Sequence, residues 1–253
     1  MIFVKTEWDY TELADAYLQR PDYSEAAINQ LLSAAKVPSG CKVCDVGAGT
    51  GHLTKMLGRK GFEVHAVEPN DAMRRNGVEV TRGMPNVTWF EGTGEATGRP
   101  SGVFPLVTFG SSFNVTDRPL ALAETARMLR PNGWFACMWN HRDLKDPIQQ
   151  EIEKVISSEI PGYQYGARRE DQTEVIRASK IFSEAVYIEG SVTHEQSIEA
   201  CIEAWLSHAT LQRQAGERFK FVVDKISRYL KGLGQPVITI PYTTRLWAAH
   251  KLS

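Results

Sequence analysis

This sequence lacks the features that direct a protein to nucleic acid, to a membrane or to secretion. Its 253 residues hold 29 lysines and arginines against 30 aspartates and glutamates, which gives a net charge of −1. Such a balance offers no excess positive charge to a nucleic-acid backbone or an anionic membrane. The apolar runs are too short for a bilayer span, and the run that starts at Met1 is too short for a signal peptide. We therefore expect a cytoplasmic protein with a small-molecule substrate and with neither nucleic acid nor membrane as a partner.

Cysteine is also scarce, with four in the whole chain. Cys41 and Cys44 form a C-x-x-C pattern, which is used in redox chemistry and in zinc sites. The sequence has no second cysteine pair of this kind to complete a zinc site. We therefore expect reduced cysteines at the start of a strand, and no metal site.

The most informative stretch runs from Val43 to Asn70 and reads VCDVGAGTGHLTKMLGRKGFEVHAVEPN. Two apolar runs flank an amphipathic segment, which predicts a strand, a helix and a second strand. Gly47, Gly49 and Gly51 predict a turn that a ligand approaches closely, because a side chain there would obstruct it. Glu68 ends the second predicted strand, where a carboxylate can accept both hydroxyls of a ribose. We therefore expect a nucleoside to bind across the open end of this unit.

The glycine spacing indicates which nucleoside binds. A NAD site requires G-x-G-x-x-G, whereas here the third glycine comes one residue early and His52 occupies the required position. The pattern DVGAGTG, from Asp45 to Gly51, instead resembles motif I of class I S-adenosylmethionine-dependent methyltransferases. Glu68 falls where that family has its ribose-binding acid. A dinucleotide oxidoreductase is the weaker alternative.

Three further segments carry the same resemblance in the expected order. The segment DYTELADAYLQRPDYS resembles the N-terminal part of many small-molecule methyltransferases, which folds over the cofactor. The loop GTGEA after a β run resembles the family's adenine-binding loop, although the aspartate common at the position of Thr93 is absent. A predicted helix followed by LRPNGWFACMW resembles the step that precedes the fifth strand.

The resemblance implies a fold and an activity. It implies an α/β fold with a Rossmann-like, seven-stranded, mostly parallel sheet, helices on both faces, an N-terminal helical lid and a C-terminal helical insertion. It also implies that S-adenosyl-L-methionine is the cofactor and that a methyl group is transferred to a small-molecule acceptor. Whether oxygen, nitrogen or carbon receives the methyl group is left open.

Candidate site residues follow from the matched segments and from the expected strand ends, since ligands of open α/β sheets bind at the carboxyl ends of strands. The cofactor-binding candidates are Asp45, Gly47, Ala48, Gly49, Gly51, Glu68, Pro69, Thr93, Gly94, Glu95 and Ser111, with Tyr10, Tyr17 and Arg20 from the lid. The substrate candidates are Phe113, Asn114, His141 and Arg142. We place His141 and Arg142 beyond the end of the fifth strand, and His141 is the candidate general base.

We expect one methyltransferase domain over residues 1–253. Lid helices are expected within 1–40, the cofactor-binding core within 41–146, and a helical cap within 195–235, between a sixth strand at 183–193 and a last strand within 237–249. A long insertion near the site is where acceptor specificity is expected. A packing or dimer surface is the other interpretation of this segment, so a homodimer is left open.

Two other functions are considered. A regulatory or scaffold protein could bind S-adenosylmethionine or S-adenosylhomocysteine without transferring methyl, and the glycine turn and the acid do not separate it from an enzyme. A nucleic-acid methyltransferase is disfavoured by the charge balance. It is also disfavoured because the segment 111–114 reads SSFN in place of an Asp/Asn/Ser-Pro-Pro-aromatic motif.

Overall fold

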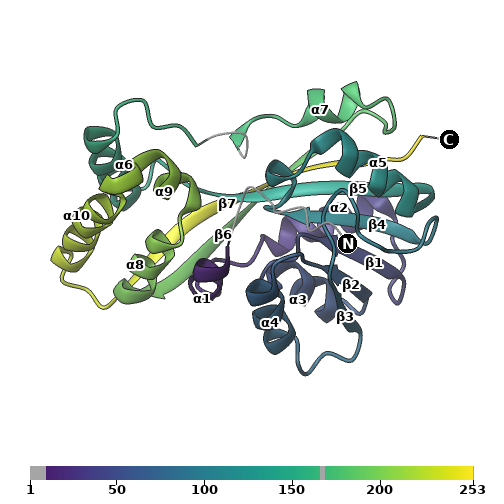
Figure 1. The fold of residues 1–253 in the computed structure, drawn as a ribbon, viewed down its shortest axis with the longest axis horizontal. Coiled ribbons are helices and arrows are strands. Elements are labelled where there is room, and N and C mark those ends of the chain that lie inside the picture. Colours follow the sequence, from purple (N-terminus) through teal and green to yellow (C-terminus); the bar gives the residue numbers. More distant parts are fainter. Residues whose placement is uncertain (1–9, 166–168, 253) are drawn as a thin grey trace.

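The computed structural model describes residues 10–165 and 169–252 (Figure 1). Its α-helices are α1 (Ala14–Tyr17), α2 (Glu25–Ala35), α3 (His52–Arg59), α4 (Asp71–Val80), α5 (Arg118–Met128), α6 (Pro147–Glu159), α7 (Thr173–Ala178), α8 (Ile198–Leu206), α9 (Ala209–Ala215) and α10 (Phe219–Gly232). Its strands are β1 (Lys42–Val46), β2 (Glu63–Val67), β3 (Val87–Phe90), β4 (Phe104–Gly110), β5 (Leu129–Arg142), β6 (Val186–Ser197) and β7 (Val237–His250).

The strands of the described residues form one seven-stranded sheet in the order β3-β2-β1-β4-β5-β7-β6. β1 to β5 run parallel, and β7 pairs antiparallel with both β5 and β6. The predicted fold class, a Rossmann-like and mostly parallel sheet, is therefore confirmed. The strand order reverses between β1 and β4, which is where open α/β sheets form a crevice at the carboxyl ends of their strands.

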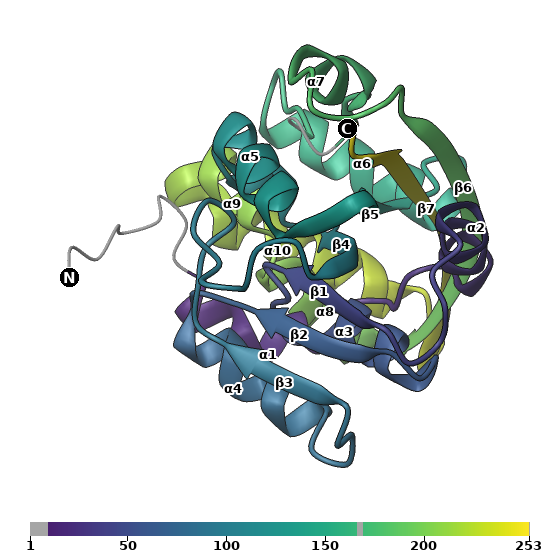
Figure 2. The same cartoon turned by 90° about the vertical axis from the view of Figure 1, so that its right-hand side faces the viewer.

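The alternation of side chains along the strands creates a separate apolar core on each face of the sheet. In β1, Cys44 and Val46 pack on the face covered by α5 and α7, whereas Val43 packs on the face covered by α2 and α3. Figure 2 shows α5 above the sheet and α3 below it. Polar caps begin two of these helices: the side chain of Ser24 accepts a hydrogen bond from the α2 backbone, and the side chain of Asp117 accepts one from the α5 backbone.

A third core holds the helical cap at one end of the molecule (Figure 1). Helices α8, α9 and α10 lie between β6 and β7, and they pack together with α6 on Ile238, Ile240 and Tyr242 of β7. The sequence placed helices in this insertion but did not join α6 to them. The sixth strand begins and ends later in the chain than predicted, because β6 pairs with β7 from Val186 as far as Ser197. None of the helices described here is long and apolar enough to cross a membrane.

The fifth strand extends further than its sequence indicated. We placed His141 and Arg142 beyond the end of the strand, which was wrong: both lie within β5, paired with Thr243 and Tyr242 of β7. The antiparallel partner keeps β5 extended to its last residue. These two side chains are therefore held on a strand and not on a loop.

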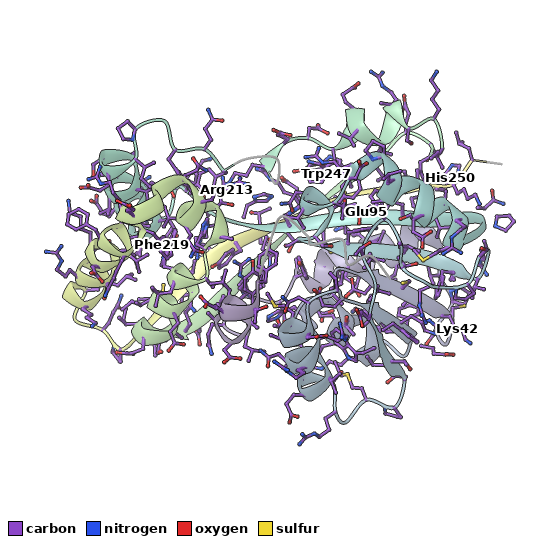
Figure 3. All side chains as sticks on the ribbon, in the orientation of Figure 1. Lys42, Glu95, Arg213, Phe219, Trp247 and His250 are labelled. Carbon is purple, nitrogen blue, oxygen red and sulfur yellow. The ribbon has the colours of Figure 1, made fainter. Side chains whose placement is uncertain are left out.

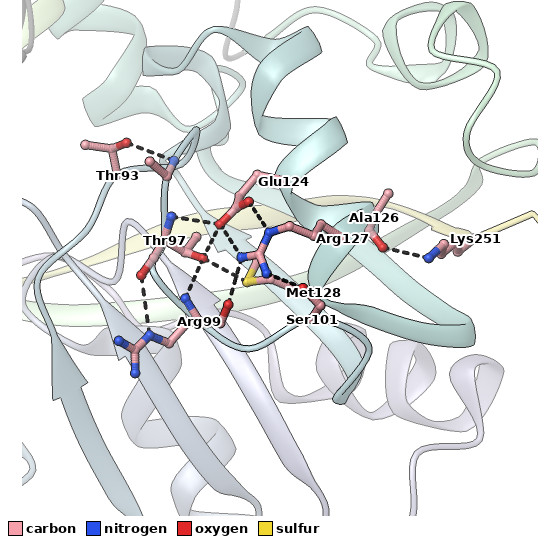
Figure 4. Close-up of polar contacts among 10 residues, drawn as sticks. Thr93, Thr97, Arg99, Ser101, Glu124, Ala126, Arg127, Met128 and Lys251 are labelled. Carbon is pink, nitrogen blue, oxygen red and sulfur yellow. Dashed lines mark hydrogen bonds and ion pairs between the residues drawn. The ribbon is translucent and has the colours of Figure 1, made fainter.

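A polar network ties the loop after β3 to helix α5 (Figure 4). The carboxylate of Glu124 accepts a hydrogen bond from the backbone N–H of Thr97 at 2.9 Å and another from Arg127 Nε at 2.7 Å. Arg127 also donates to Ser101 Oγ at 2.7 Å. These hydrogen bonds hold the residues that directly follow the predicted adenine loop against α5.

The packing of α4 against β3 depends on the absence of a side chain at Gly77. A Cβ there would lie 2.1 Å from the ring of Trp89. We expect Gly77→Ala to lower the free energy of unfolding by about 1–3 kcal/mol, because the indole must be displaced. Gly83→Ala is the matched control, since a Cβ there meets nothing within 4 Å. Urea unfolding of both variants tests this, and equal stabilities would contradict the packing described.

Candidate active site

A cleft of about 250 Å³ opens at the carboxyl ends of the parallel strands. Its walls come from the segment before α2, the turn after β1, the ends of β2, β4 and β5, and the cap. The cap lies beyond the carboxyl ends of the strands. In Figure 3, Lys42, at the amino end of β1, lies on the side of the molecule away from Phe219 of α10. The strands therefore point their carboxyl ends toward the cap.

The turn after β1 leaves its backbone open to the cleft. Gly47 and Gly49 have φ angles of +64° and +57°, a region that L side chains rarely adopt. A Cβ at Gly47 would lie 2.4 Å from Cβ of Ser112, so this glycine allows the turn to pack on the end of β4. A Cβ at Gly49 would meet nothing within 4 Å. A ligand can therefore approach the backbone at Gly49 directly.

The carboxylate of Glu68 joins this turn to the segment after β2. Its Oε2 accepts a hydrogen bond from Gly49 N at 2.8 Å, and its Oε1 accepts one from Asn70 N at 2.9 Å. Burial raises the pKa of Glu68, while the two backbone N–H groups act in the opposite direction. Each carboxylate oxygen can accept a second hydrogen bond, so Glu68 keeps capacity for hydroxyl donors from the cleft.

Asp45 lies at the floor of the cleft, but its carboxylate serves the protein itself. It accepts hydrogen bonds from Thr54 Oγ1 at 2.7 Å and from Thr108 Oγ1 at 3.0 Å, which connects β1 to α3 and to β4. Burial raises the pKa of Asp45 to about 7, against the effect of these two bonds, and the nearby charge of Glu68 adds to the rise.

Two hydroxyl groups close to the turn complete this half of the cleft. The Oγ1 atom of Thr50 is buried and has no hydrogen-bond partner among the described residues. Ser111, with a φ of +60°, shares a hydrogen bond of 2.9 Å with the hydroxyl of Tyr23. An unsatisfied buried hydroxyl is costly, so a polar ligand at this position would relieve it. Together with Glu68 and the open backbone at Gly49, these groups fit the nucleoside part of S-adenosylmethionine.

The lid segment covers the cleft and reaches the cap. The rings of Tyr10 and Tyr17 meet edge to face with centroids 5.6 Å apart. The guanidinium of Arg20 lies 3.7 Å from the centroid of the Tyr17 ring and donates to Ser207 O at 3.1 Å. The lid therefore contacts the loop that joins α8 to α9.

A set of hydrogen bonds that the sequence did not suggest fixes the lid to the sheet. His52 Nδ1 lies 2.7 Å from Asp22 Oδ1, and Asn140 Nδ2 donates to Asp22 O at 3.0 Å. Burial raises the pKa of Asp22, but hydrogen bonds from His52 and Lys55 outweigh it and bring the pKa down to about 2. The Asp22 carboxylate thus sits beside the first residue of α3, where a dinucleotide would need its pyrophosphate. This arrangement disfavours the NAD alternative.

Most of the predicted site residues line the cleft. They are Tyr10, Tyr17, Arg20, Asp45, Gly47, Ala48, Gly49, Glu68, Pro69, Thr93, Gly94, Glu95, Ser111, Asn114, His141 and Arg142. Their contacts with cofactor or acceptor stay predictions. Gly51 and Phe113 are corrections, because neither lies on the cleft. Gly51 precedes α3 with a φ of +88° and faces the ring of Trp89, and Phe113 packs on Phe109 and Phe135 in the core.

The cap end of the cleft includes residues that sequence reasoning missed. They are Glu153, Tyr165, Arg169, Ala204, His208 and Tyr242. They belong to segments that follow β5, and no motif marks them. They come from α6, the segment between α6 and α7, the cap and β7, which only the tertiary fold brings together at the site.

Comparison with known proteins identifies the family. A family model described as a methyltransferase domain matches residues 44–137, which begin in β1 and end in β5. The core of this chain is a class I methyltransferase domain. The family's cofactor is S-adenosylmethionine, and the buried Thr50 hydroxyl, the Gly49 backbone and Glu68 of this methyltransferase domain fit it. Among the described residues, no group of three or more His, Cys, Asp or Glu side chains could hold a metal ion.

Named relatives of the methyltransferase domain cover part of the chain. An uncharacterized methyltransferase of Mycobacterium tuberculosis is 34% identical over 138 residues, which are 54% of this chain and 54% of that protein. The chain thus spans about half the length of the curated mycobacterial relatives that it matches. The demethylmenaquinone methyltransferase of Tropheryma whipplei is 27% identical over 172 residues, 64% of this chain and 70% of that protein.

A solved structure shows the same fold as the methyltransferase domain. Phosphoethanolamine N-methyltransferase 2 of Haemonchus contortus was solved with phosphomonomethylethanolamine and S-adenosylhomocysteine. It is 16% identical to this chain, with a TM-score of 0.54 over 98% of this chain and 59% of that one. At this identity the similarity concerns the fold alone.

The raised pKa of Asp45 gives the methyltransferase domain a testable pH dependence. The folded state holds this proton up to about pH 7, whereas the unfolded chain releases it near pH 4. The buried carboxyl therefore stabilises the fold fully below pH 4 and loses that contribution as the pH rises to 7, by roughly 1.4 kcal/mol per pH unit.

Asp45→Asn removes this titration. We expect the stability of the variant relative to the wild type to increase between pH 5 and pH 7, measured as free energies of unfolding in urea. Titration of other groups cancels in the difference between the two proteins. A difference that does not change with pH would contradict the assigned pKa.

Proposed function

We propose that this protein transfers the methyl group of S-adenosylmethionine to a small-molecule acceptor. One observation carries the proposal: a single cleft joins the nucleoside-binding half, with Gly49 and Glu68, to a second half that the lid and the cap enclose. A protein that only binds the cofactor has no need of that second half. A cleft walled by the lid and the cap suits a small acceptor better than a nucleic acid.

The work of the chain in this reaction is mainly binding and orientation. Bound S-adenosylmethionine supplies an already activated methyl group, so the protein has to hold the acceptor in line with that group and keep water away. Glu68 and the glycine turn would hold the ribose, and the loop Thr93–Glu95 would hold the adenine. Arg20, which contacts the cap, and the Tyr17 ring against its guanidinium would exclude water.

His141 is the proposed general base for an acceptor that must lose a proton. It is buried, with 5% of its surface exposed, and it lines the acceptor half of the cleft. Its place on β5, paired with Thr243, fixes its backbone firmly. An imidazole can take a proton near neutral pH, as such a reaction requires.

The acceptor itself is not named by the relatives. The demethylmenaquinone methyltransferase resembles 64% of this chain at 27% identity. The family model that matches this chain ends within β5. Many residues at the proposed acceptor end of the cleft follow that point, in the segment between α6 and α7 and in the cap. A cytoplasmic location and a homodimer stay predictions from the sequence.

Loss of the Glu68 charge is expected to weaken cofactor binding. Glu68→Gln replaces one carboxylate oxygen by an NH2 group, which cannot accept a hydrogen bond from a ribose hydroxyl. Hydrogen bonds to charged groups contribute about 1.5–3 kcal/mol. The dissociation constant for S-adenosylhomocysteine should therefore rise roughly 10- to 100-fold in isothermal titration calorimetry. Glu91→Gln is the control, since that side chain is 65% exposed. An unchanged constant in a folded Glu68→Gln protein would remove the cofactor assignment.

Release of S-adenosylhomocysteine separates an enzyme from a binding protein. Wild-type protein with S-adenosylmethionine and a panel of small hydroxyl, amine and carbon acceptors should release it with at least one acceptor. With a hydroxyl acceptor, His141→Gln should lower kcat by about 100-fold or more, the range of general-base catalysis. His250→Gln, at the far end of β7, should leave kcat unchanged. No release with any acceptor would favour the regulatory alternative, whereas an unchanged kcat in His141→Gln would remove only the base.

A further inference from the structure

Charged groups are unevenly distributed along the cleft. The carboxylates of Asp45 and Glu68 lie at the nucleoside end, beside the glycine turn. Arg142 and Arg169 line the opposite end of the cleft. Among the described residues at that end, Glu153 carries the one carboxylate that also lines the cleft. The acceptor end therefore carries more positive than negative charge.

Arg142 has only neutral partners in the described residues. Its guanidinium lies 4.1 Å from the centroid of the Trp205 ring and 5.7 Å from that of the Tyr242 ring. The hydroxyl of Tyr242 accepts a hydrogen bond from it. Its Nε is buried without a hydrogen-bond partner among the residues described here, and none of the ion pairs found there includes Arg142.

Arg169 also lines the cleft and has similar surroundings. Its guanidinium lies 3.9 Å from the centroid of the Tyr165 ring, and its Nε is also buried without a hydrogen-bond partner in the described part of the chain. Burial lowers the pKa of Arg169, and repulsion from Arg245 and Arg142 lowers it further, although Tyr165 and Glu153 act in the opposite direction. The two guanidinium groups are thus close enough to interact.

The aromatic contacts alone do not account for this arrangement. A cation over an aromatic ring gains only a small free energy, whereas removing a charge from water costs considerably more unless a counter-charge is present. Glu153 is near Arg169, but its side chain hydrogen-bonds to Tyr165. An anionic group from the ligand would supply the missing counter-charge, because guanidinium groups bind carboxylates and phosphates with paired hydrogen bonds.

We propose that the methyl acceptor is an anionic small molecule, whose carboxylate or phosphate group is held between Arg142 and Arg169. This proposal rests on the proposed methyltransferase function and names the class of its substrate. His208 also lines the cleft, and its Nδ1 accepts a hydrogen bond from Leu211 N at 3.2 Å. The anionic group fixes one end of the acceptor and leaves its nucleophilic atom toward His141 and the cofactor half.

A comparison of anionic and neutral probes tests the proposal on the wild-type protein. The full chain, saturated with S-adenosylhomocysteine, is titrated at constant ionic strength with succinate, with its uncharged analogue succinamide, and with inorganic phosphate. We expect succinate or phosphate to bind at least tenfold more tightly than succinamide, and the preferred anion identifies the group. Equal binding of succinate, succinamide and phosphate would overturn the proposal without use of any variant.

Variants then locate the site. Arg142→Met and Arg169→Met keep much of the apolar side chain, and each should weaken binding of the preferred anion at least tenfold while the affinity for S-adenosylhomocysteine stays within twofold. Arg228→Met, at an exposed position on α10, is the matched control. Anion binding that persists in both cleft variants would overturn the proposal. Failure of S-adenosylhomocysteine to bind the wild type would instead contradict the proposed function itself.

Discussion

The carboxylate of Glu68 is the contact on which the arrangement of the site depends. It joins Gly49 N and Asn70 N, so one side chain fixes the turn after β1 and the segment that leads into α4. In this position the Glu68 carboxylate is buried, which raises its pKa, and the two backbone donors oppose that rise. The same carboxylate faces the cleft, and the structural role and the proposed ribose contact therefore share one group.

The second half of the site is built by parts of the chain that are distant in sequence. β5 and β7 extend together beyond the parallel strands and carry both His141 and the apolar base of the cap. The lid reaches the cap through Arg20 and Ser207 and is held to the sheet side by His52 and Asn140. An enclosed, positively charged acceptor pocket results from this assembly and not from the cofactor-binding core alone.

The sequence predicted the core well because its signals are local. Glycines at fixed spacing and an acid after the next strand mark one strand-turn-helix-strand unit, and the structure has both the turn with positive φ angles and Glu68 beside it. Phe113 was misassigned because burial of an aromatic ring outweighed its position beside polar neighbours. Arg169 and Tyr165 could not be predicted, because no motif marks them and only the tertiary fold brings them into the cleft with Arg142 of β5.

The central claim is that this cleft binds S-adenosylmethionine with its ribose on Glu68 and its reactive end toward the cap. A crystal structure of the full chain with S-adenosylhomocysteine tests it most directly. The account predicts ribose hydroxyls within hydrogen-bond distance of the Glu68 carboxylate, and the sulfur facing the side of the cleft lined by His141 and Arg142. A ligand bound elsewhere, or with its sulfur directed away from these residues, would contradict it.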